Sequence, residues 1–426
     1  MKDESRIEAS IELLSEIEES NLPADVISTQ YFRARRYIGS KDRRRISEIV
    51  FAIIRNRLLI RHLAGEKSYT PRLAVMIYLI ALEKESKDDV DALFSGDHHA
   101  PEQMDTREFE IIKQLSIDDI NDLPENIRFS IPDWAFTRIN EYFEKPRKEF
   151  AALNQAASLD LRVNTLKSNY NDVCAKLKEY EFEFGRGKYS PWCIRMPRGK
   201  NLSDSEIYRD GMIEVQDEGS QLIAVLVDAK PGDSVFDMCA GAGGKTLAIG
   251  AMMQNKGRLI AGDINDGRLD QLTARAKRAG LTNLEKRYTG SKDKKWIKRQ
   301  EANFDKVLLD VPCTGTGTWR RNPDLKWRFN ESDLQEIMKK QKSILGFGAK
   351  LVKPGGRLVY STCSIMRDEN ETQIEKFLEQ NPDFSLFDIS GMIPGLEGPY
   401  LRLTPAQHQT DGFFGAVLIK SAAIIS

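Results

Sequence analysis

The sequence predicts a multidomain protein with an all-α N-terminal domain, a small α+β module and a C-terminal α/β domain. Apolar residues recur at helical spacing through roughly the first 125 residues. Apolar and polar residues then alternate over 159–166, which is typical of a half-buried strand. From residue 217 onward, short apolar runs alternate with helical stretches. We therefore place the domains at residues 1–128, 129–216 and 217–426.

The N-terminal helices are predicted from their apolar faces. Between Ile7 and Ile17, apolar residues recur at spacings of four, three and three, which is one face of a 3.6-residue period. A second stripe covers 46–58. The nearly all-apolar segment 73–82 predicts a buried central helix, and 95–101 reads as a loop. One more helix is expected over 133–150.

Strands and helices of the other two parts are predicted in chain order. The α+β module begins with the strand at 159–166, followed by a helical stretch and short strands up to about residue 216. In the last domain, strands are predicted at 234–238, 259–263, near 284, 304–310, 356–363 and 413–419. A helix is expected at 266–279. Near-continuous apolar strands separated by helices indicate a parallel sheet covered on both faces.

Composition excludes several classes of protein. The chain has 426 residues, 41% apolar and 30% charged, as in a folded protein. Its 63 basic and 64 acidic residues give a net charge of −1, which excludes a globally basic nucleic-acid binder but not a local basic patch. The longest apolar run, 73–82, is shorter than the roughly 18 residues of a membrane span. Five cysteines without a CxxC pair and four histidines predict no metal and a reduced, cytoplasmic compartment.

A glycine-rich segment, Asp237–Thr246, follows the first predicted strand of the α/β domain and opens a helix. Gly241, Gly243 and Gly244 allow a tight turn and a close approach to a ligand. The first strand–helix turn of an open α/β sheet is the place where nucleotide-like ligands bind. The segment is therefore a candidate cofactor loop.

Three ligands compete for this loop, and a glycine turn without a ligand is a fourth alternative. A Walker A site requires a glycine where Cys239 stands, and a dinucleotide fingerprint requires one where Thr246 stands. S-adenosylmethionine carries no phosphate and needs only close backbone approach and an acid for its ribose. Asp263 ends the second strand twenty residues after Gly243, where a ribose-binding carboxylate is expected.

Two cysteines follow two successive predicted strands. The fourth strand continues into Asp310-Val-Pro-Cys313, and the fifth ends in Ser361-Thr-Cys363-Ser364. The carboxyl ends of parallel strands are where open α/β sheets bind ligands. A lone cysteine there is usually a small core residue. Two at neighbouring strand ends favour a chemical role.

These motifs together resemble those of the RNA (cytosine-5) methyltransferases of the RsmB (Sun/Fmu) type. The similarity also covers Gln216–Gln221, Asn322–Arg328, Asp411–Phe414 and Leu161–Thr165, and it extends into the N-terminal helices. It implies a NusB-like helical domain, an RRM-like module and a Rossmann-type class I methyltransferase domain. It further implies S-adenosylmethionine as cofactor and 16S (small-subunit) rRNA as substrate. We expect a monomer, although the sequence does not give the oligomeric state.

The resemblance also implies roles for individual residues. Cys363 is the nucleophile, Cys313 assists release of the product, and Asp310 contacts the cytosine ring and the cofactor side of the pocket. Lys245 is a candidate positive charge that favours a thiolate. The implied cofactor residues are Cys239, Ala240, Gly241, Ala242, Gly243, Gly244, Lys245, Asp263, Arg268 and Asp310. The family places an acid near the adenine after the third strand, where this chain has Tyr288–Ser291 and then Asp293.

The chemistry explains the need for a thiolate, because C5 of cytosine is a poor nucleophile. A thiolate that adds to C6 makes C5 enamine-like, so that C5 can attack a methyl group. A base then removes the C5 proton, and the thiolate leaves. This is covalent catalysis, in which one difficult step becomes two easier ones.

Basic residues gather in three segments despite the neutral total charge. Segment 33–45 has seven Lys and Arg residues and one acid, and 286–299 has seven around Trp296. Segment 319–328 combines four with Trp319 and Trp327. Such segments suit phosphate contacts and base stacking, although each is also compatible with an ordinary solvated charged face.

Three alternatives stay open from the sequence. The same chemistry could act on tRNA or another RNA. The chain could be a non-catalytic RNA-binding assembly factor, although its intact motifs argue against this. Finally, Cys313 could be the nucleophile, as in DNA cytosine methyltransferases. Cys174 and Cys193 lie in no motif and are interpreted as structural.

Overall fold

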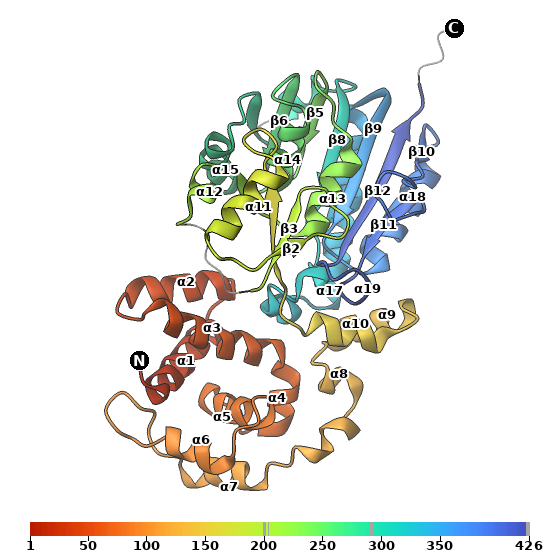
Figure 1. The fold of residues 1–426 in the computed structure, drawn as a ribbon. Coiled ribbons are helices and arrows are strands. Elements are labelled where there is room, and N and C mark those ends of the chain that lie inside the picture. Colours follow the sequence, from red (N-terminus) through yellow and green to blue (C-terminus); the bar gives the residue numbers. More distant parts are fainter. Residues whose placement is uncertain (199–201, 203, 290–293, 423–426) are drawn as a thin grey trace. The chain divides into compact units, whose positions relative to one another are not determined.

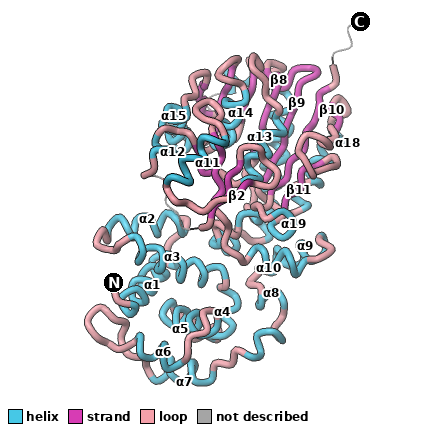
Figure 2. Tube along the Cα trace, in the orientation of Figure 1, coloured by secondary structure: helices cyan, strands magenta, loops and turns pink. Residues whose placement is uncertain are grey.

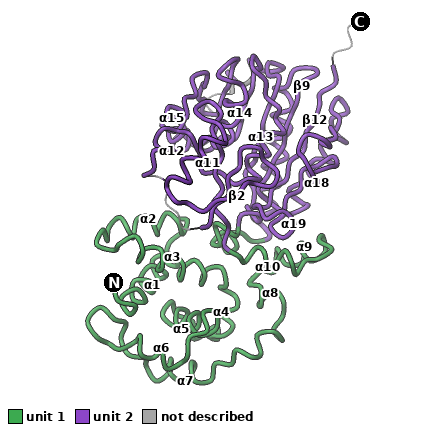
Figure 3. Tube along the Cα trace, in the orientation of Figure 1, with its two compact units in different colours: residues 1–155, 319–330 green, residues 156–318, 331–426 purple. Residues whose placement is uncertain are grey.

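The computed structural model describes residues 1–198, 202, 204–289 and 294–422. The chain forms two compact units (Figure 3). Unit 1 comprises residues 1–155 and 319–330, and unit 2 comprises 156–318 and 331–426. No helix in the described part of the chain is long and apolar enough to cross a bilayer.

Unit 1 is helical and is organised around one apolar helix. Its helices are α1 (Asp3–Glu18), α2 (Ala24–Ala34), α3 (Ser40–Arg55), α4 (Arg57–Ala64), α5 (Pro71–Ala81), α6 (Lys87–Leu93), α7 (Thr106–Gln114), α8 (Glu125–Arg128), α9 (Asp133–Tyr142) and α10 (Pro146–Leu153). Helix α5 begins with a proline after Thr70, whose hydroxyl caps the Leu73 N–H. Residues 73–81 are all buried in the unit's core, which confirms the predicted central helix (Figure 1).

Two helix predictions are wrong in detail. The stripe over 46–58 is divided at Asn56, which separates α3 from α4. The single helix expected over 133–150 is two helices, α9 and α10. A proline inside a helix lacks an N–H and would clash with the preceding turn. Pro146 therefore lies in the first turn of a new helix, α10, where both effects are tolerated.

Segment 319–330 packs inside unit 1, although it follows the Pro-Cys motif in the sequence. Trp319 and Lys326 are fully buried. The Lys326 ammonium donates to the carbonyl oxygens of Arg55 and Ser130, each at 3.2 Å, and to Asn154 Oδ1. Burial lowers the pKa of Lys326 well below its usual value. The prediction that 319–328 offers a basic and aromatic RNA surface is therefore wrong for these two side chains, which hold the unit together.

Unit 2 contains a small antiparallel sheet in the order β2-β3-β1-β4. Its strands are β1 (Leu159–Val163), β2 (Gly185–Arg186), β3 (Cys193–Met196) and β4 (Ile213–Val215), with helices α11 (Tyr170–Glu179) and α12 (Glu206–Arg209). Leu161, Val163 and Ile194 point from the sheet into one apolar cluster with Val173 and Leu177 of α11. This arrangement confirms the predicted α+β module.

The large sheet of unit 2 has the order β10-β12-β9-β8-β5-β6-β7, with β11 paired to β12. Figure 2 draws the strands of unit 2 in magenta. Its strands are β5 (Ser234–Asp237), β6 (Arg258–Asp263), β7 (Leu284–Tyr288), β8 (Phe304–Asp310), β9 (Val352–Thr362), β10 (Phe384–Leu386), β11 (Tyr400–Leu403) and β12 (Phe413–Lys420). The helices are α13 (Glu218–Val227), α14 (Gly244–Met252), α15 (Asp266–Ala279), α16 (Lys294–Lys298), α17 (Glu331–Leu351), α18 (Glu371–Gln380) and α19 (Pro405–His408).

This sheet is covered on both faces, as predicted. Helices α13, α14 and α15 contribute to the core on one face, and α17 and α18 contribute to the core on the other. Strands β5 to β9 are parallel, but β10, β11 and β12 are antiparallel to their neighbours, so the expectation of a purely parallel sheet is wrong at this edge. Nine residues join β11 to β12, too few for the crossover that a parallel pair needs.

We expect Lys326→Ala to lower the free energy of unfolding by about 3 kcal/mol, because it leaves three buried acceptors without their donor. Urea denaturation of the full chain measures this loss. Lys340→Ala, at an exposed position of α17, is the matched control and should change the midpoint little. Equal midpoints for the two variants would show that Lys326 does not hold the segment.

Candidate active site

The predicted cofactor loop joins β5 to α14 and is a tight turn. Gly241 and Gly243 have φ values of +55° and +82°, which L side chains rarely adopt. A Cβ on Gly243 would collide with Leu272, whereas one on Gly241 would meet nothing within 4 Å. The loop is thus packed on one side and borders open space on the other, as a ligand cradle must.

Asp263 at the end of β6 is bound to this loop. Its Oδ2 accepts the Gly241 N–H at 2.8 Å, and its Oδ1 accepts the Asn265 N–H at 2.8 Å. Each carboxylate oxygen has a further lone pair, so Asp263 can still accept hydroxyl groups of a ribose. Arg268 lies in the first turn of α15 with an exposed side chain, and its N–H caps onto Asn265.

Three carboxyl groups, those of Asp237, Asp263 and Asp310, surround the loop. Burial raises the pKa of Asp237 to about 7, and its Oδ1 has no hydrogen-bond partner among the described residues. Burial, together with the charges of Asp237, Asp310 and Asp263, also raises the pKa of Cys239. Asp310 is balanced by Lys245, so Asp263 is the carboxylate that disfavours phosphate and favours a cation such as a sulfonium at the loop. The loop therefore fits S-adenosylmethionine better than ATP or a dinucleotide.

Two arginines that lie outside the glycine-rich loop hold its backbone in place. Arg162 on β1 is buried and donates to the Gly244 carbonyl oxygen at 3.2 Å. Arg275 on α15 donates to the Ala242 carbonyl oxygen at 2.7 Å and pairs with Glu214 of β4. The small sheet and α15 therefore both fix the backbone that faces the open space.

The two cysteines meet at the carboxyl ends of β8 and β9. Their sulfur atoms are 3.4 Å apart, and both residues are half-buried. The hydrogen bond to Cys363, together with burial, raises the pKa of Cys313 well above its usual value. With its raised pKa, Cys313 can act as the donor of this hydrogen bond, which would stabilise negative charge on the Cys363 sulfur.

Asp310 and Lys245 form an ion pair beside the cysteines. The Lys245 ammonium lies 2.6 Å from Asp310 Oδ2, and Ser361 Oγ donates to Asp310 Oδ1 at 3.0 Å. Burial alone would lower the pKa of Lys245, but the charge of Asp310 and their hydrogen bond raise it. The Cys363 charge contributes in the same direction, so Lys245 is electrostatically coupled to that thiol. A Walker A lysine would instead be available to phosphate.

A buried carboxylate that the sequence analysis missed joins the two cysteine loops. Glu369 accepts the N–H of Thr314 at 2.8 Å and also its hydroxyl, and it accepts the hydroxyl of Ser364. Gln341 of α17 donates to the same carboxylate at 3.0 Å. Thr314 follows Cys313 and Ser364 follows Cys363, so one side chain sets the spacing of both thiols. Its only sequence signal is its place six residues after Cys363.

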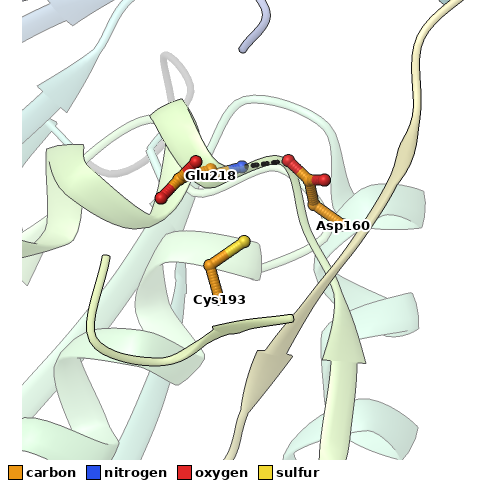
Figure 4. Close-up of side chains that lie close together, drawn as sticks. All are labelled: Asp160, Cys193 and Glu218. Carbon is orange, nitrogen blue, oxygen red and sulfur yellow. Dashed lines mark hydrogen bonds between the residues drawn. The ribbon is translucent and has the colours of Figure 1, made fainter. Parts of the chain in front are cut away.

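A second buried cluster, Asp160, Cys193 and Glu218, has the composition of a metal site (Figure 4). Arg195 donates to both oxygens of Asp160 and to Glu218, and Asp160 also accepts the Glu218 N–H at 3.0 Å. Burial raises the pKa of Cys193, so it stays a thiol. The lone pairs that a cation would need are taken by donors, and the cluster instead joins the small sheet to α13.

Other predicted residues lie as follows. Ala240 and Ala242 belong to the loop, where the Ala240 N–H donates to the Gly262 carbonyl oxygen at 2.8 Å. The adenine region predicted at Tyr288–Ser291 and Asp293 falls partly on 290–293, outside the described residues. The same gap interrupts the basic segment 286–299.

The sheet order, the glycine turn after β5 and the acid after β6 define a Rossmann-type methyltransferase domain. Residues 224–419 match the family model described as 16S rRNA methyltransferase RsmB/F, and residues 131–203 match that of its ferredoxin-like domain. The chain belongs to the RsmB/F family of 16S rRNA methyltransferases. As a member, it is an S-adenosylmethionine-dependent RNA methyltransferase.

Individual relatives agree with this assignment. "Probable ribosomal RNA small subunit methyltransferase B" of Synechocystis is 35% identical over 303 residues, 69% of this chain and 68% of that protein. Its counterpart in Salmonella paratyphi B is 32% identical over 294 residues, 69% of this chain and 67% of that protein. The crystal structure of PH0851 aligns with a TM-score of 0.79 at 29% identity and covers 99% of both chains.

Removal of the Glu369 carboxylate should separate the two thiol loops. We expect Glu369→Ala to lower kcat about 100-fold, since small misplacements of reacting groups cost that much. The Kd of S-adenosylmethionine should stay nearly constant, because the cofactor loop does not contact Glu369. Single-turnover methylation and calorimetry measure the two quantities. Glu375→Ala, exposed on α18, is the control, and equal rates for both variants would contradict the assigned role.

Arg275 and Arg278 provide a matched pair for the loop supports. Both pair with Glu214, but only Arg275 reaches the loop carbonyl. We expect Arg275→Gln to weaken S-adenosylmethionine binding about tenfold, the cost of one lost charged hydrogen bond. Arg278→Gln should weaken it much less. Calorimetric titration measures the affinity of both variants for S-adenosylmethionine. Equal affinities would rule out a specific effect of Arg275 on the loop.

Proposed function

We propose that this enzyme methylates C5 of a cytosine in 16S rRNA, with Cys363 as the nucleophile. The observation that carries the proposal is the pair of thiols 3.4 Å apart, in which burial and the hydrogen bond to Cys363 raise the pKa of Cys313. The Lys245–Asp310 ion pair lies next to them on the side of the cofactor loop. Membership of the 16S rRNA methyltransferase family supports the choice of RNA.

The reaction begins when the Cys363 thiolate adds to C6 of the cytosine and forms a carbon–sulfur bond. The electron pair of the C5=C6 bond then makes C5 nucleophilic, and S-adenosylmethionine supplies the methyl group that C5 receives. A base removes the C5 proton, the C5=C6 bond re-forms, and the Cys363 thiolate leaves. Cys313 lies within hydrogen-bond distance of that sulfur and stabilises its negative charge as it departs.

The cofactor would be held by the loop at 239–245 and by Asp263. The loop offers backbone groups at close range, and Asp263 offers acceptors for the ribose hydroxyls. Asp310, fixed by Lys245 and Ser361, would face both the cofactor and the cytosine ring. Arg268, exposed beside Asp263 on α15, would be an outer contact.

The helical domain, residues 1–128, would be NusB-like and would bind RNA through the segment 33–45. Arg33, Arg36, Lys41 and Arg44 are exposed there, and Tyr37 is 77% exposed, so phosphate contacts and base stacking are both available. The RRM-like module (129–216) and the catalytic domain (217–426) complete the proposed division. We propose a monomeric, metal-free enzyme in the cytoplasm, a reducing compartment that keeps the two neighbouring thiols from oxidation.

The alternative with Cys313 as nucleophile is disfavoured by its raised pKa, because only a thiolate adds to C6. Cys363 has the better environment, with a thiol donor on one side and the Lys245 charge nearby. Nothing in the structure favours tRNA over rRNA as substrate.

A denaturing gel tests this assignment. Cys313→Ala should accumulate a covalent adduct with an unmodified 16S rRNA transcript and S-adenosylmethionine, because release of Cys363 is slowed. Cys363→Ala should form no adduct and lose methyl transfer by at least about 1,000-fold. Cys174→Ala is the control, since this cysteine lies on α11. An adduct that needs Cys313 and survives without Cys363 would reverse the two roles.

A further inference from the structure

Unit 2 contains a cavity of about 580 Å³ whose lining includes neither Cys313 nor Cys363. One wall is the loop 186–192 between β2 and β3, the floor is α13, and the other wall is the segment 387–394 after β10. The side chains that matter for recognition are Arg186, Lys188, Trp192, Arg357, Phe387 and Met392. Its volume is in the range of small-ligand sites.

The loop wall of this cavity is fixed by the buried cluster of Figure 4. Glu218 accepts the N–H groups of Tyr189 and Ser190 at 2.6 and 2.9 Å. A Cβ on Gly187 would collide with Cys193 and Glu218, so the loop backbone is drawn tightly onto the cluster. The Ser190 hydroxyl donates to Gln221 of α13 at 2.7 Å. The cavity is therefore pre-formed, which reduces the entropy that a ligand must lose on binding.

The cavity is positively charged. Arg186 and Lys188 are exposed at its rim. Deeper inside, Arg357 donates to the Leu226 carbonyl oxygen at 3.0 Å, while its Nε is buried and has no hydrogen-bond partner among the described residues. Burial lowers the pKa of Arg357, so its charge is incompletely compensated. The acid of the lining, Asp228, is shared between two cations: it lies 2.6 Å from the Lys230 ammonium and 3.9 Å from the Arg357 guanidinium.

Aromatic and aliphatic side chains lie beside these cations. Phe387 is 36% exposed, and the Arg357 guanidinium lies 5.0 Å from its ring centroid. Trp192 is half-buried on the opposite wall, and Leu222 and Val225 form the floor. Aromatic rings beside cations are the combination that holds an unstacked base together with its phosphate.

We propose that this cavity binds a single unstacked nucleotide of the RNA substrate, remote from the target cytosine. Arg357 lies six residues before Cys363 along β9 and its end, which at about 3.3 Å per residue separates the two sites by roughly 20 Å. The bound nucleotide therefore flanks the target and contributes to RNA affinity and register rather than to chemistry. This inference rests on the proposed function only in that the ligand is RNA.

The test is equilibrium binding of an unmodified 16S rRNA transcript to the full chain, without S-adenosylmethionine and at several salt concentrations. Phe387→Ala should weaken binding roughly five-fold or more, the typical loss of one base–aromatic stack. Arg186→Ala/Lys188→Ala should reduce the magnitude of the salt slope by about 1.4, since each phosphate contact on a single strand contributes about 0.7. Under turnover, both variants should raise KM for RNA and leave kcat unchanged.

Matched controls separate this effect from folding and from general charge. Tyr180→Ala removes an aromatic side chain of similar exposure, 37%, on the same unit, and Lys376→Ala removes an exposed cation of α18. Both should bind RNA as the wild type does, and every variant should keep the wild-type Kd for S-adenosylmethionine. Lys188→Glu, at an exposed position, provides a stronger perturbation that leaves packing intact.

Three results would overturn the inference. The first is unchanged RNA affinity in Phe387→Ala and Lys188→Glu. The second is saturation of the cavity by cytidine 5′-monophosphate with no effect on RNA binding, which would mark a free-nucleotide site. The third is an unchanged KM for RNA in both variants under turnover. RNA binding is measured without turnover. The test of the cavity therefore gives a result even if the methylation proposal fails.

Discussion

The chemistry of this site depends on one constraint, the position of the buried Glu369 carboxylate between two loops. Thr314 and Ser364 follow Cys313 and Cys363, and both donate to this carboxylate. Burial raises the pKa of Glu369, and its four hydrogen bonds oppose this shift, so the contacts offset part of the cost of burying the carboxylate. Two thiols on different strands can therefore stay 3.4 Å apart without a covalent link.

Charge divides the site into a cofactor side and a base side. Asp237 and Asp263 lie beside the candidate cofactor loop, and the charge of Lys245 is balanced by Asp310. The small sheet takes part in this arrangement, because Arg162 of β1 reaches the loop backbone. The ferredoxin-like module therefore helps to hold the backbone of the candidate cofactor loop.

Sequence patterns predicted the helices and strands that have a local apolar periodicity. They missed strand direction and the contacts between residues that are far apart in the sequence. The buried α5, the strands β5 to β8 and the cysteines at two strand ends follow from apolar spacing and chain order. The antiparallel β12 could not be predicted, because strand direction leaves no trace in an apolar run. Glu369 was missed because its partners lie up to 55 residues away in the sequence. Lys326 was misread because a lysine next to a tryptophan has the composition of an RNA contact even where it is fully buried.

The chain passes from unit 2 to unit 1 immediately after the loop that carries Cys313. Gly317 belongs to unit 2, where its N–H donates to the Cys363 carbonyl oxygen and its own carbonyl oxygen accepts the Gly412 N–H. Trp319, two residues later, is buried in unit 1. The chain is thus anchored in both units with a single residue, Thr318, between the anchors. The segment that completes the core of unit 1 therefore begins immediately after the loop that carries Cys313.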